Sequence, residues 1–150
     1  MRILLDIDGV MVPAKSWKSV EKLEDGFACF NITAATLLQK IISETGATIV
    51  LTTSHKSLYS IVEWKNIFSR RGVYANFDKL ADNGLRLSRK DEILSWLKKN
   101  NSNEKFVILD DDTSLNDLPI EVKSKLVLTS PYIGLNIEKA DFAIKILQGQ

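Results

Sequence analysis

Short apolar runs recur along the chain, and each of them ends in polar or turn-forming residues. None alternates cleanly between apolar and polar positions. Continuous apolar runs of this length are typical of strands in a parallel sheet that is covered on both faces. The runs that predict strands are residues 2–6, 47–53, 105–110 and 125–130, with a weaker one at 72–77.

Between these runs, apolar residues recur at helical spacing. Asn31 and Gly46 are placed to cap the two ends of the first such pattern, and Ser88 with Asp91 forms a capping-box pattern at the start of the third. The helical patterns cover residues 31–46, 58–72, 88–100 and 136–147. This alternation predicts a doubly wound, Rossmann-like α/β fold, with a parallel sheet of about five strands and helices on both faces.

One connection is longer than such a fold needs. Residues 10–30 separate the first predicted strand from the first helix, whereas connections of this kind usually take about 2–6 residues. We expect a short flap insert here rather than a separate cap domain. Residues 76–87 form a moderate loop, and no other connection is long enough to hold a folded lid. Residues 1–150 are therefore predicted to form a single domain.

Composition and charge indicate which partners and which compartment fit this domain. Twenty basic and nineteen acidic residues give a formal net charge of +1, which does not support bulk attraction to nucleic acid or to a membrane. Cys29 is the only cysteine, which excludes an intrachain disulfide and fits a reducing compartment. The sequence has neither a membrane-spanning apolar run nor a signal-peptide pattern. We expect a cytoplasmic protein without a membrane partner; an oligomer is allowed by the sequence but not indicated by it.

Acidic residues follow two of the predicted strands, at the sheet edge where open α/β proteins bind ligands. Asp6 and Asp8 follow the first strand, and Asp110, Asp111 and Asp112 end the run at 105–110. Two carboxylates about 4 Å apart repel by about 4 kcal/mol at an effective dielectric of about 20. Such a cluster needs a cation or must stay partly protonated. Oxygen ligands without histidine or thiolate favour magnesium. Asp112 is an additional acid to which the sequence assigns no role.

The same residues suit phosphate chemistry. One aspartate of the first pair can act as a nucleophile. The other, which projects into the site once the chain turns at Gly9, can act as general acid and base. Thr53 is placed to hydrogen-bond a phosphoryl oxygen, with Thr52 and Ser54 as alternatives if the register shifts by one.

Several basic residues near these strand ends are candidates for offsetting phosphate charge. Lys90 stands at the start of a predicted helix, where backbone N–H groups also favour anions. Lys56 is its rival, and Arg86 and Arg89 flank Lys90 as further candidates for substrate contact. His55 follows the second strand, and we interpret it as a surface or structural residue.

Taken in order, "LLDIDGV", "IVLTTS", Lys90 and "VILDDD" resemble the four motifs of the haloacid dehalogenase (HAD) superfamily. The resemblance spans nearly the full chain. More narrowly, the chain resembles small capless members that include domains found beside RNA-repair enzymes, and it is similar to polynucleotide 3′-phosphatase domains. Gly134 and Leu135 match a "GL" pair of that subgroup. The resemblance implies a magnesium-dependent phosphatase that acts through an aspartyl-phosphate.

Carried over by motif, the resemblance implies a role for each matching residue. Asp6 becomes the nucleophile, Asp8 the general acid and base, Thr53 the phosphate-binding hydroxyl and Lys90 the motif-three lysine. The presence of Asp8 points away from dehalogenases, which lack that acid. The implied metal ligands for Mg²⁺ are Asp6, Asp8, Asp110 and Asp111. The expected substrate-binding residues are Gly9, Thr52, Ser54 and Lys56.

Two other functions fit parts of the pattern. A signalling receiver domain also phosphorylates an aspartate beside magnesium, but its acids and hydroxyl occur in another order. A non-catalytic phosphate-binding or interaction module on the same fold is the main alternative, although the intact pair Asp6 and Asp8 disfavours it. Without a cap, an open site suits either a large substrate, such as a nucleic-acid end, or a small phosphate ester.

Overall fold

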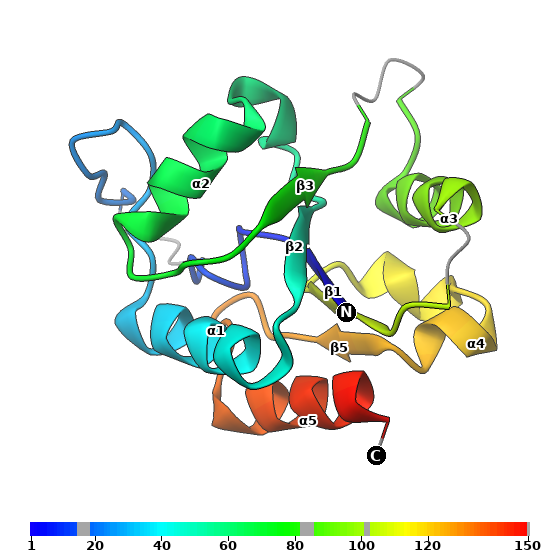
Figure 1. Cartoon of the computed structure of the whole chain (residues 1–150). Helices are drawn as coiled ribbons and strands as arrows, with labels where there is room; N and C mark the ends of the chain where they lie inside the picture. The colour runs from blue at the N-terminus through cyan, green and yellow to red at the C-terminus, as the bar shows by residue number, and fades with distance from the viewer. Residues whose placement is uncertain (15–18, 82–85, 101–102, 150) are drawn as a thin grey trace.

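A five-stranded parallel sheet forms the centre of the protein (Figure 1). The architecture is given by a computed structural model, which describes residues 1–14, 19–81, 86–100 and 103–149. The strand order is β3-β2-β1-β4-β5, so the order reverses between β1 and β4. The strands are β1 (Arg2–Leu5), β2 (Thr48–Leu51), β3 (Phe77–Lys79), β4 (Phe106–Asp110) and β5 (Leu126–Leu128). The predicted Rossmann-like α/β fold is confirmed.

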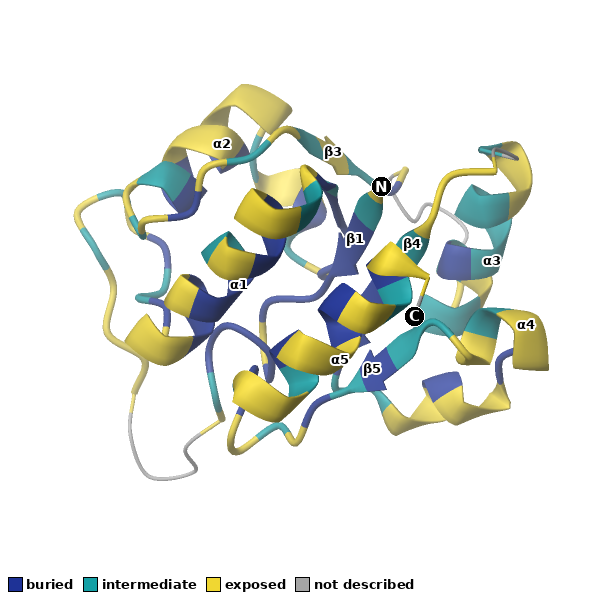
Figure 2. Ribbon diagram, turned by 60° about the horizontal axis from the view of Figure 1, so that its bottom comes forward, coloured by how far each residue is buried: buried dark blue, intermediate teal, exposed yellow. Residues whose placement is uncertain are grey.

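Helices connect the strands and turn one apolar side toward the sheet, which leaves their outer sides exposed (Figure 2). They are α1 (Ile32–Thr45), α2 (Ile61–Ser69), α3 (Arg89–Lys99), α4 (Ile120–Lys123) and α5 (Ile137–Gln148), with 3-10 turns η1 (Lys56–Leu58) and η2 (Thr113–Asp117). The predicted caps of α1 are present: the Asn31 side chain accepts a hydrogen bond from the Ala34 N–H, and Gly46 is left-handed. Within the described residues, no helix combines the length and apolar character needed to span a bilayer.

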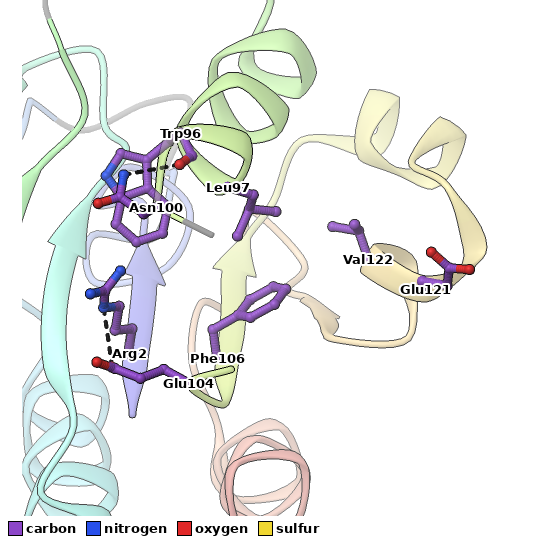
Figure 3. A pocket seen from close by; sticks show the side chains of 8 residues that line it. All are labelled: Arg2, Trp96, Leu97, Asn100, Glu104, Phe106, Glu121 and Val122. Atoms are coloured by element: carbon purple, nitrogen blue, oxygen red, sulfur yellow. Dashed lines mark hydrogen bonds and ion pairs between the residues drawn. The ribbon is translucent and has the colours of Figure 1, made fainter. Parts of the chain in front are cut away.

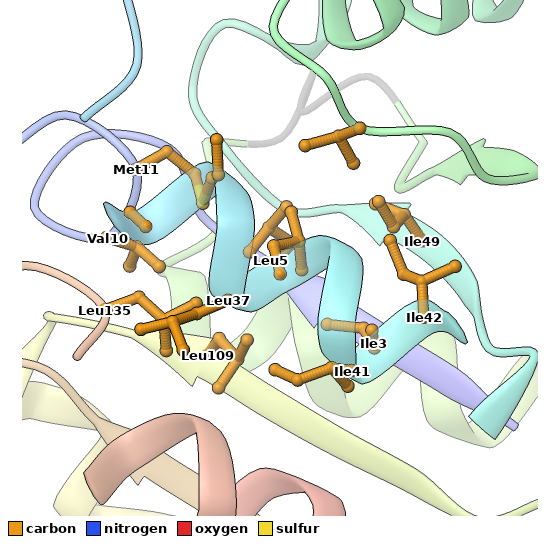
Figure 4. Close-up of a cluster of buried hydrophobic side chains, with 14 of the residues drawn as sticks. Ile3, Leu5, Val10, Met11, Leu37, Ile41, Ile42, Ile49, Leu109 and Leu135 are labelled. Carbon is orange, nitrogen blue, oxygen red and sulfur yellow. The ribbon is translucent and has the colours of Figure 1, made fainter. Parts of the chain in front are cut away.

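Both faces of the sheet are buried, because neighbouring positions along each strand point to opposite sides. The larger core cluster contains Ile3, Leu5 and Leu109 and includes residues of α1, α2 and α5 (Figure 4). Leu4 and Ile108 point the other way, into a second cluster with side chains of α3 and η2. This arrangement explains why the strand sequences are continuously apolar rather than alternating.

The third strand lies later in the sequence than predicted. The weak apolar run at 72–77 was expected to form it, but β3 spans Phe77–Lys79. Gly72 and Val73 instead donate backbone hydrogen bonds to carbonyls of the last turn of α2, at 3.1 and 3.0 Å. Val73 is fully buried, so its apolar character serves the packing of this turn rather than a strand.

The insert between β1 and α1 forms no separate cap in its described part, residues 10–14 and 19–30. Lys22 and Ala28 form a single antiparallel bridge. Arg71, in the turn just after α2, donates to both carboxylate oxygens of Asp25 at 2.7 and 2.9 Å. It also donates to the carbonyls of Phe27 and Ala28, each at 2.9 Å. We call these contacts the Arg71 clamp.

The Arg71 side chain is almost completely buried in the clamp, with 2% of it exposed. The hydrogen bonds from Arg71 lower the pKa of Asp25 to about 2. The arginine also lies over the rings of Phe27 and Phe30, with its guanidinium carbon 5.7 and 5.2 Å from their centroids. The base of the insert is therefore attached firmly to α2.

A hollow of about 220 Å³ lies between α3 and α4 at the amino-terminal edge of the sheet (Figure 3). Arg2 and Phe106, which begin β1 and β4, line it with Trp96. Two of its polar groups pair with each other: Arg2 lies 3.2 Å from Glu104, and its guanidinium also lies over the Trp96 ring. This hollow is at the opposite edge from the residues predicted to be catalytic.

Candidate active site

Three carboxylates meet at the carboxyl ends of β1 and β4. Asp6 follows β1, Asp110 ends β4, and Asp111 comes next. One oxygen from each lies within 4.8 Å of the other two. β1 and β4 are the strands between which the sheet order reverses, which is where open α/β sheets bind ligands. The topology therefore brings together three of the five acids that the sequence analysis expected at this edge, although Asp6 is about a hundred residues from the other two.

Burial makes this acid cluster electrostatically unfavourable on its own. Asp110 is fully buried and Asp6 is 6% exposed. Burial, followed by repulsion from Asp110, raises the pKa of Asp6 from 3.8 to about 8. Burial and Asp110 likewise raise the pKa of Asp111. Without a metal ion, Asp6 and Asp111 therefore keep their protons to a higher pH than ordinary carboxyl groups do.

The metal-free protein is expected to lose stability as the pH rises. Because the pKa of Asp6 rises from 3.8 to about 8 on folding, the folded state binds a proton that the unfolded chain has released. This stabilisation is complete below the unfolded-state value and is lost as the pH passes the folded-state value. Thermal melts in chelator between about pH 5 and pH 9 should show a falling Tm. Asp6→Asn should make the fall shallower; a flat wild-type profile would contradict the shift.

Arg89 is the cation that the structure places against this cluster. Its guanidinium donates to Asp110 at 2.7 Å and lies 3.5 Å from Asp6. Burial opposes its charge, but Asp110 and Asp6 more than compensate and raise the pKa of Arg89. The sequence interpretation gave this position to Lys90. Lys90 is the next residue of α3, and adjacent helical positions point in different directions. Among the described residues, Lys90 makes no ion pair.

Asp8 lies apart from the buried acids. Its side chain is 62% exposed, and its Oδ2 lies 2.8 Å from His55 Nε2. It is not among the three carboxylates that converge, although the sequence interpretation had counted it with the metal ligands. The structure thus separates the two aspartates of the opening motif into a buried one and an exposed one. Since a carboxylate can only accept, the imidazole N–H is the donor when Asp8 is ionised.

The residues after β2 occupy different environments. Thr52 and Thr53 are fully buried, whereas Ser54 is exposed. The Thr53 hydroxyl accepts a hydrogen bond from the His55 backbone N–H at 3.3 Å. Lys56 was a candidate for phosphate contact, but it is 4% exposed and lies 2.8 Å from Glu92 of α3. It therefore ties the turn after β2 to the helix that carries the guanidinium.

Gly9 lies against the acid cluster. Its φ is +82°, and an added Cβ would come 2.0 Å from Asp111 Oδ2, so no side chain fits there. Gly134 makes a similar close approach, in which a Cβ would meet the Val10 carbonyl at 2.6 Å. These contacts explain why glycine stands at both positions. They bring the loop after β1 against both the acids and the loop after β5.

Thr129 is a site-supporting residue that the sequence interpretation did not single out. It follows β5, is 3% exposed, and donates from its hydroxyl to the Gly9 carbonyl at 2.8 Å. It holds the turn at Gly9, directly after Asp8. The only sequence signal was its place at the end of an apolar run. Asp112, whose role was unassigned, caps η2 by accepting from the Ser114 N–H.

The three converging acids fit a magnesium ion. They supply only oxygen ligands and lie close enough to share one ion, and burial raises the pKa of both Asp6 and Asp111. Magnesium prefers such ligands and commonly leaves positions for phosphate oxygens. Asp6, Asp110 and Asp111 are therefore the residues that could hold it.

Comparison with known proteins agrees with this geometry. Residues 2–140 match the model of a family described as the HAD domain in Swiss Army Knife RNA repair proteins. No curated protein and no solved structure matches the chain. The match includes all five strands and both groups of aspartates, and it confirms the resemblance found in the motifs. At the level of the superfamily, it indicates a phosphatase-type hydrolase. The chain belongs to the family of HAD domains of Swiss Army Knife RNA repair proteins.

Proposed function

We propose that this protein is a magnesium-dependent phosphatase that hydrolyses phosphomonoesters through an aspartyl-phosphate on Asp6. The observation that carries the proposal is the convergence of Asp6, Asp110 and Asp111 with Arg89 at the point where the strand order reverses. A buried nucleophile, an acidic metal site and a cation for the phosphate are the groups that this chemistry requires.

Mg²⁺ would be held by Asp6, Asp110 and Asp111. When bound, the ion would offset the charge of these carboxylates and of the incoming phosphate. Arg89, which already contacts Asp6 and Asp110, would offset the charge that spreads over the phosphoryl oxygens. Thr53 remains our candidate for the hydroxyl that binds a phosphoryl oxygen.

The reaction proceeds in two steps. A carboxylate oxygen of Asp6 attacks phosphorus, the bond from phosphorus to the ester oxygen breaks, and Asp8 gives its proton to that leaving oxygen. Water then attacks phosphorus of the aspartyl-phosphate, and Asp8 takes the proton from that water. Inorganic phosphate leaves, and Asp6 returns as a carboxylate. The exposure of Asp8 suits contact with both a leaving group and water.

A phosphorylated nucleic-acid end is the substrate class that we favour. The family description links this domain to RNA repair. No cap covers the sheet edge in the described part of the insert, and the exposed Asp8 carboxylate leaves room for a leaving group attached to a long chain. Small phosphate esters can enter the same open site, so they are the second class to test.

The proposal is tested with a panel of phosphorylated compounds. RNA and DNA oligonucleotides with 3′- or 5′-phosphates, p-nitrophenyl phosphate and small phosphate esters should be incubated with and without magnesium. We expect phosphate release that requires Mg²⁺, and a Tm that rises with Mg²⁺ because the ion binds only the folded state. Full turnover after thorough chelation would contradict the metal requirement. Absence of turnover throughout the panel would favour the binding-module alternative.

A further inference from the structure

His55 contacts two residues of the proposed mechanism, Asp8 and Thr53. Its ring Nε2 lies 2.8 Å from Asp8 Oδ2, and its backbone N–H donates to the Thr53 hydroxyl at 3.3 Å. The first contact comes from a residue 47 positions away in the chain, so local sequence geometry does not produce it. One turn after β2 is thereby linked to the loop after β1.

The insert packs against the imidazole ring of His55. Phe27 meets it edge-to-face, with the ring centroids 5.7 Å apart and an interplanar angle of 85°. Phe27 is itself 7% exposed, packs against Trp64, and accepts at its carbonyl from Arg71 of the clamp. The imidazole is therefore held between a fixed aromatic ring and the Asp8 carboxylate, although 36% of its side chain remains exposed.

We propose that His55 is a positioning residue, which donates from Nε2 to Asp8 and holds that carboxyl in one orientation at the mouth of the site. The inference rests on the acid–base role proposed above for Asp8. An exposed aspartate on a loop would otherwise sample several rotamers, and only some of them would reach the leaving oxygen. A hydrogen bond from a supported ring restricts the carboxyl without burying it, so that it can still exchange protons with water.

The geometry predicts which reactions depend on His55. Asp8 must protonate a poor leaving group such as an alkoxide or a ribose oxygen, whereas p-nitrophenolate leaves without a proton. Removing the imidazole should therefore lower turnover of alkyl phosphates by about tenfold to a hundredfold, the range for losing one hydrogen bond to a charged group. Turnover of p-nitrophenyl phosphate should fall by less than about threefold.

The experiment compares His55→Ala, His55→Gln and Asp8→Asn with wild type, on one alkyl and one p-nitrophenyl phosphate. Circular dichroism and thermal melts would establish that each variant is folded. Glutamine places an N–H near the position of imidazole Nε2, so it should restore turnover of the alkyl ester to within about fivefold of wild type. In an Asp8→Asn background, His55→Ala should cause no further loss. Tyr74→Ala, an exposed aromatic just before β3 at the opposite sheet edge, is the matched control.

A second measurement does not depend on activity. His55 is the only histidine of the chain, so imidazole ¹⁵N resonances are free of overlap. At an alkaline pH at which imidazoles are neutral, the ring should carry its proton on Nε2, and Asp8→Asn should weaken that preference. A ring protonated on Nδ1, equal losses for both leaving groups, or no rescue by glutamine would overturn the positioning role. Inactivity of the wild type would instead overturn the proposed function, and the inference with it.

Discussion

Replacing Asp6 by asparagine should reduce phosphate release to background, a loss of more than about 10⁴-fold. Asparagine keeps the size of the side chain but removes the attacking oxyanion and one charge of the magnesium site. Asp112→Asn is the matched control, because Asp112 caps η2 and asparagine caps a helix about as well as aspartate. Steady-state assays with both variants would measure the contrast.

The same substitution separates catalysis from stability. Asparagine at position 6 cannot ionise beside Asp110, which is fully buried. The metal-free variant should therefore melt at a higher temperature than wild type above about pH 8. The gain in Tm from added magnesium should shrink. Mass spectrometry of quenched wild type should locate a phosphoryl group on the peptide that contains Asp6. An adduct mapped to any other residue would refute the assignment of the nucleophile.

Replacing Arg89 by methionine should have the second-largest effect. The change leaves the buried Asp110 carboxylate without its cation, and breaking a buried pair in this way costs about 3 kcal/mol or more. The guanidinium also lies 3.5 Å from the nucleophile, so kcat/KM should fall by about 10²–10³-fold. Unfolding in denaturant and initial-rate assays would measure the two losses separately.

Lys90→Met provides the comparison for this prediction. Because α3 directs Arg89 and not Lys90 to the carboxylates, the lysine variant should lose far less stability and activity. Lys98→Met, an exposed substitution at the far end of the same helix, controls for changes in helix propensity and surface charge. The reverse ranking, with Lys90→Met the more damaging variant, would return the phosphate-binding role to the lysine.

The acid cluster could be predicted because the end of a strand can be recognised in the sequence. An apolar run that stops at aspartate fixes where the carboxylate emerges, and a parallel sheet brings such ends to one edge. The choice between Arg89 and Lys90 had no such signal. Both residues stand in the first turn of α3 after Ser88, and a difference of one position rotates a side chain by about 100°. Packing of the whole helix on the sheet, rather than local sequence, decides which cation faces inward.

Long-range contacts account for the other differences. Lys56 was a rival candidate for the phosphate-binding lysine, but the structure pairs it with Glu92, 36 residues away in the chain. No residue near Lys56 in the sequence indicates this pairing. The contact of His55 with Asp8 and that of Thr129 with Gly9 are of the same kind. The third strand was predicted too early in the sequence because Val73 is apolar. Val73 is buried in the turn after α2 and does not belong to a strand.

The Arg71 clamp has a consequence for engineering this domain. It closes the insert at Asp25–Ala28, while Ala14 is held at the other end by its N–H bond to the Pro131 carbonyl. Between these two fixed ends, extra residues need only lengthen a closed loop, and each doubling of loop length costs about 0.6 kcal/mol. A recognition peptide grafted there would sit beside the strand ends without altering the sheet.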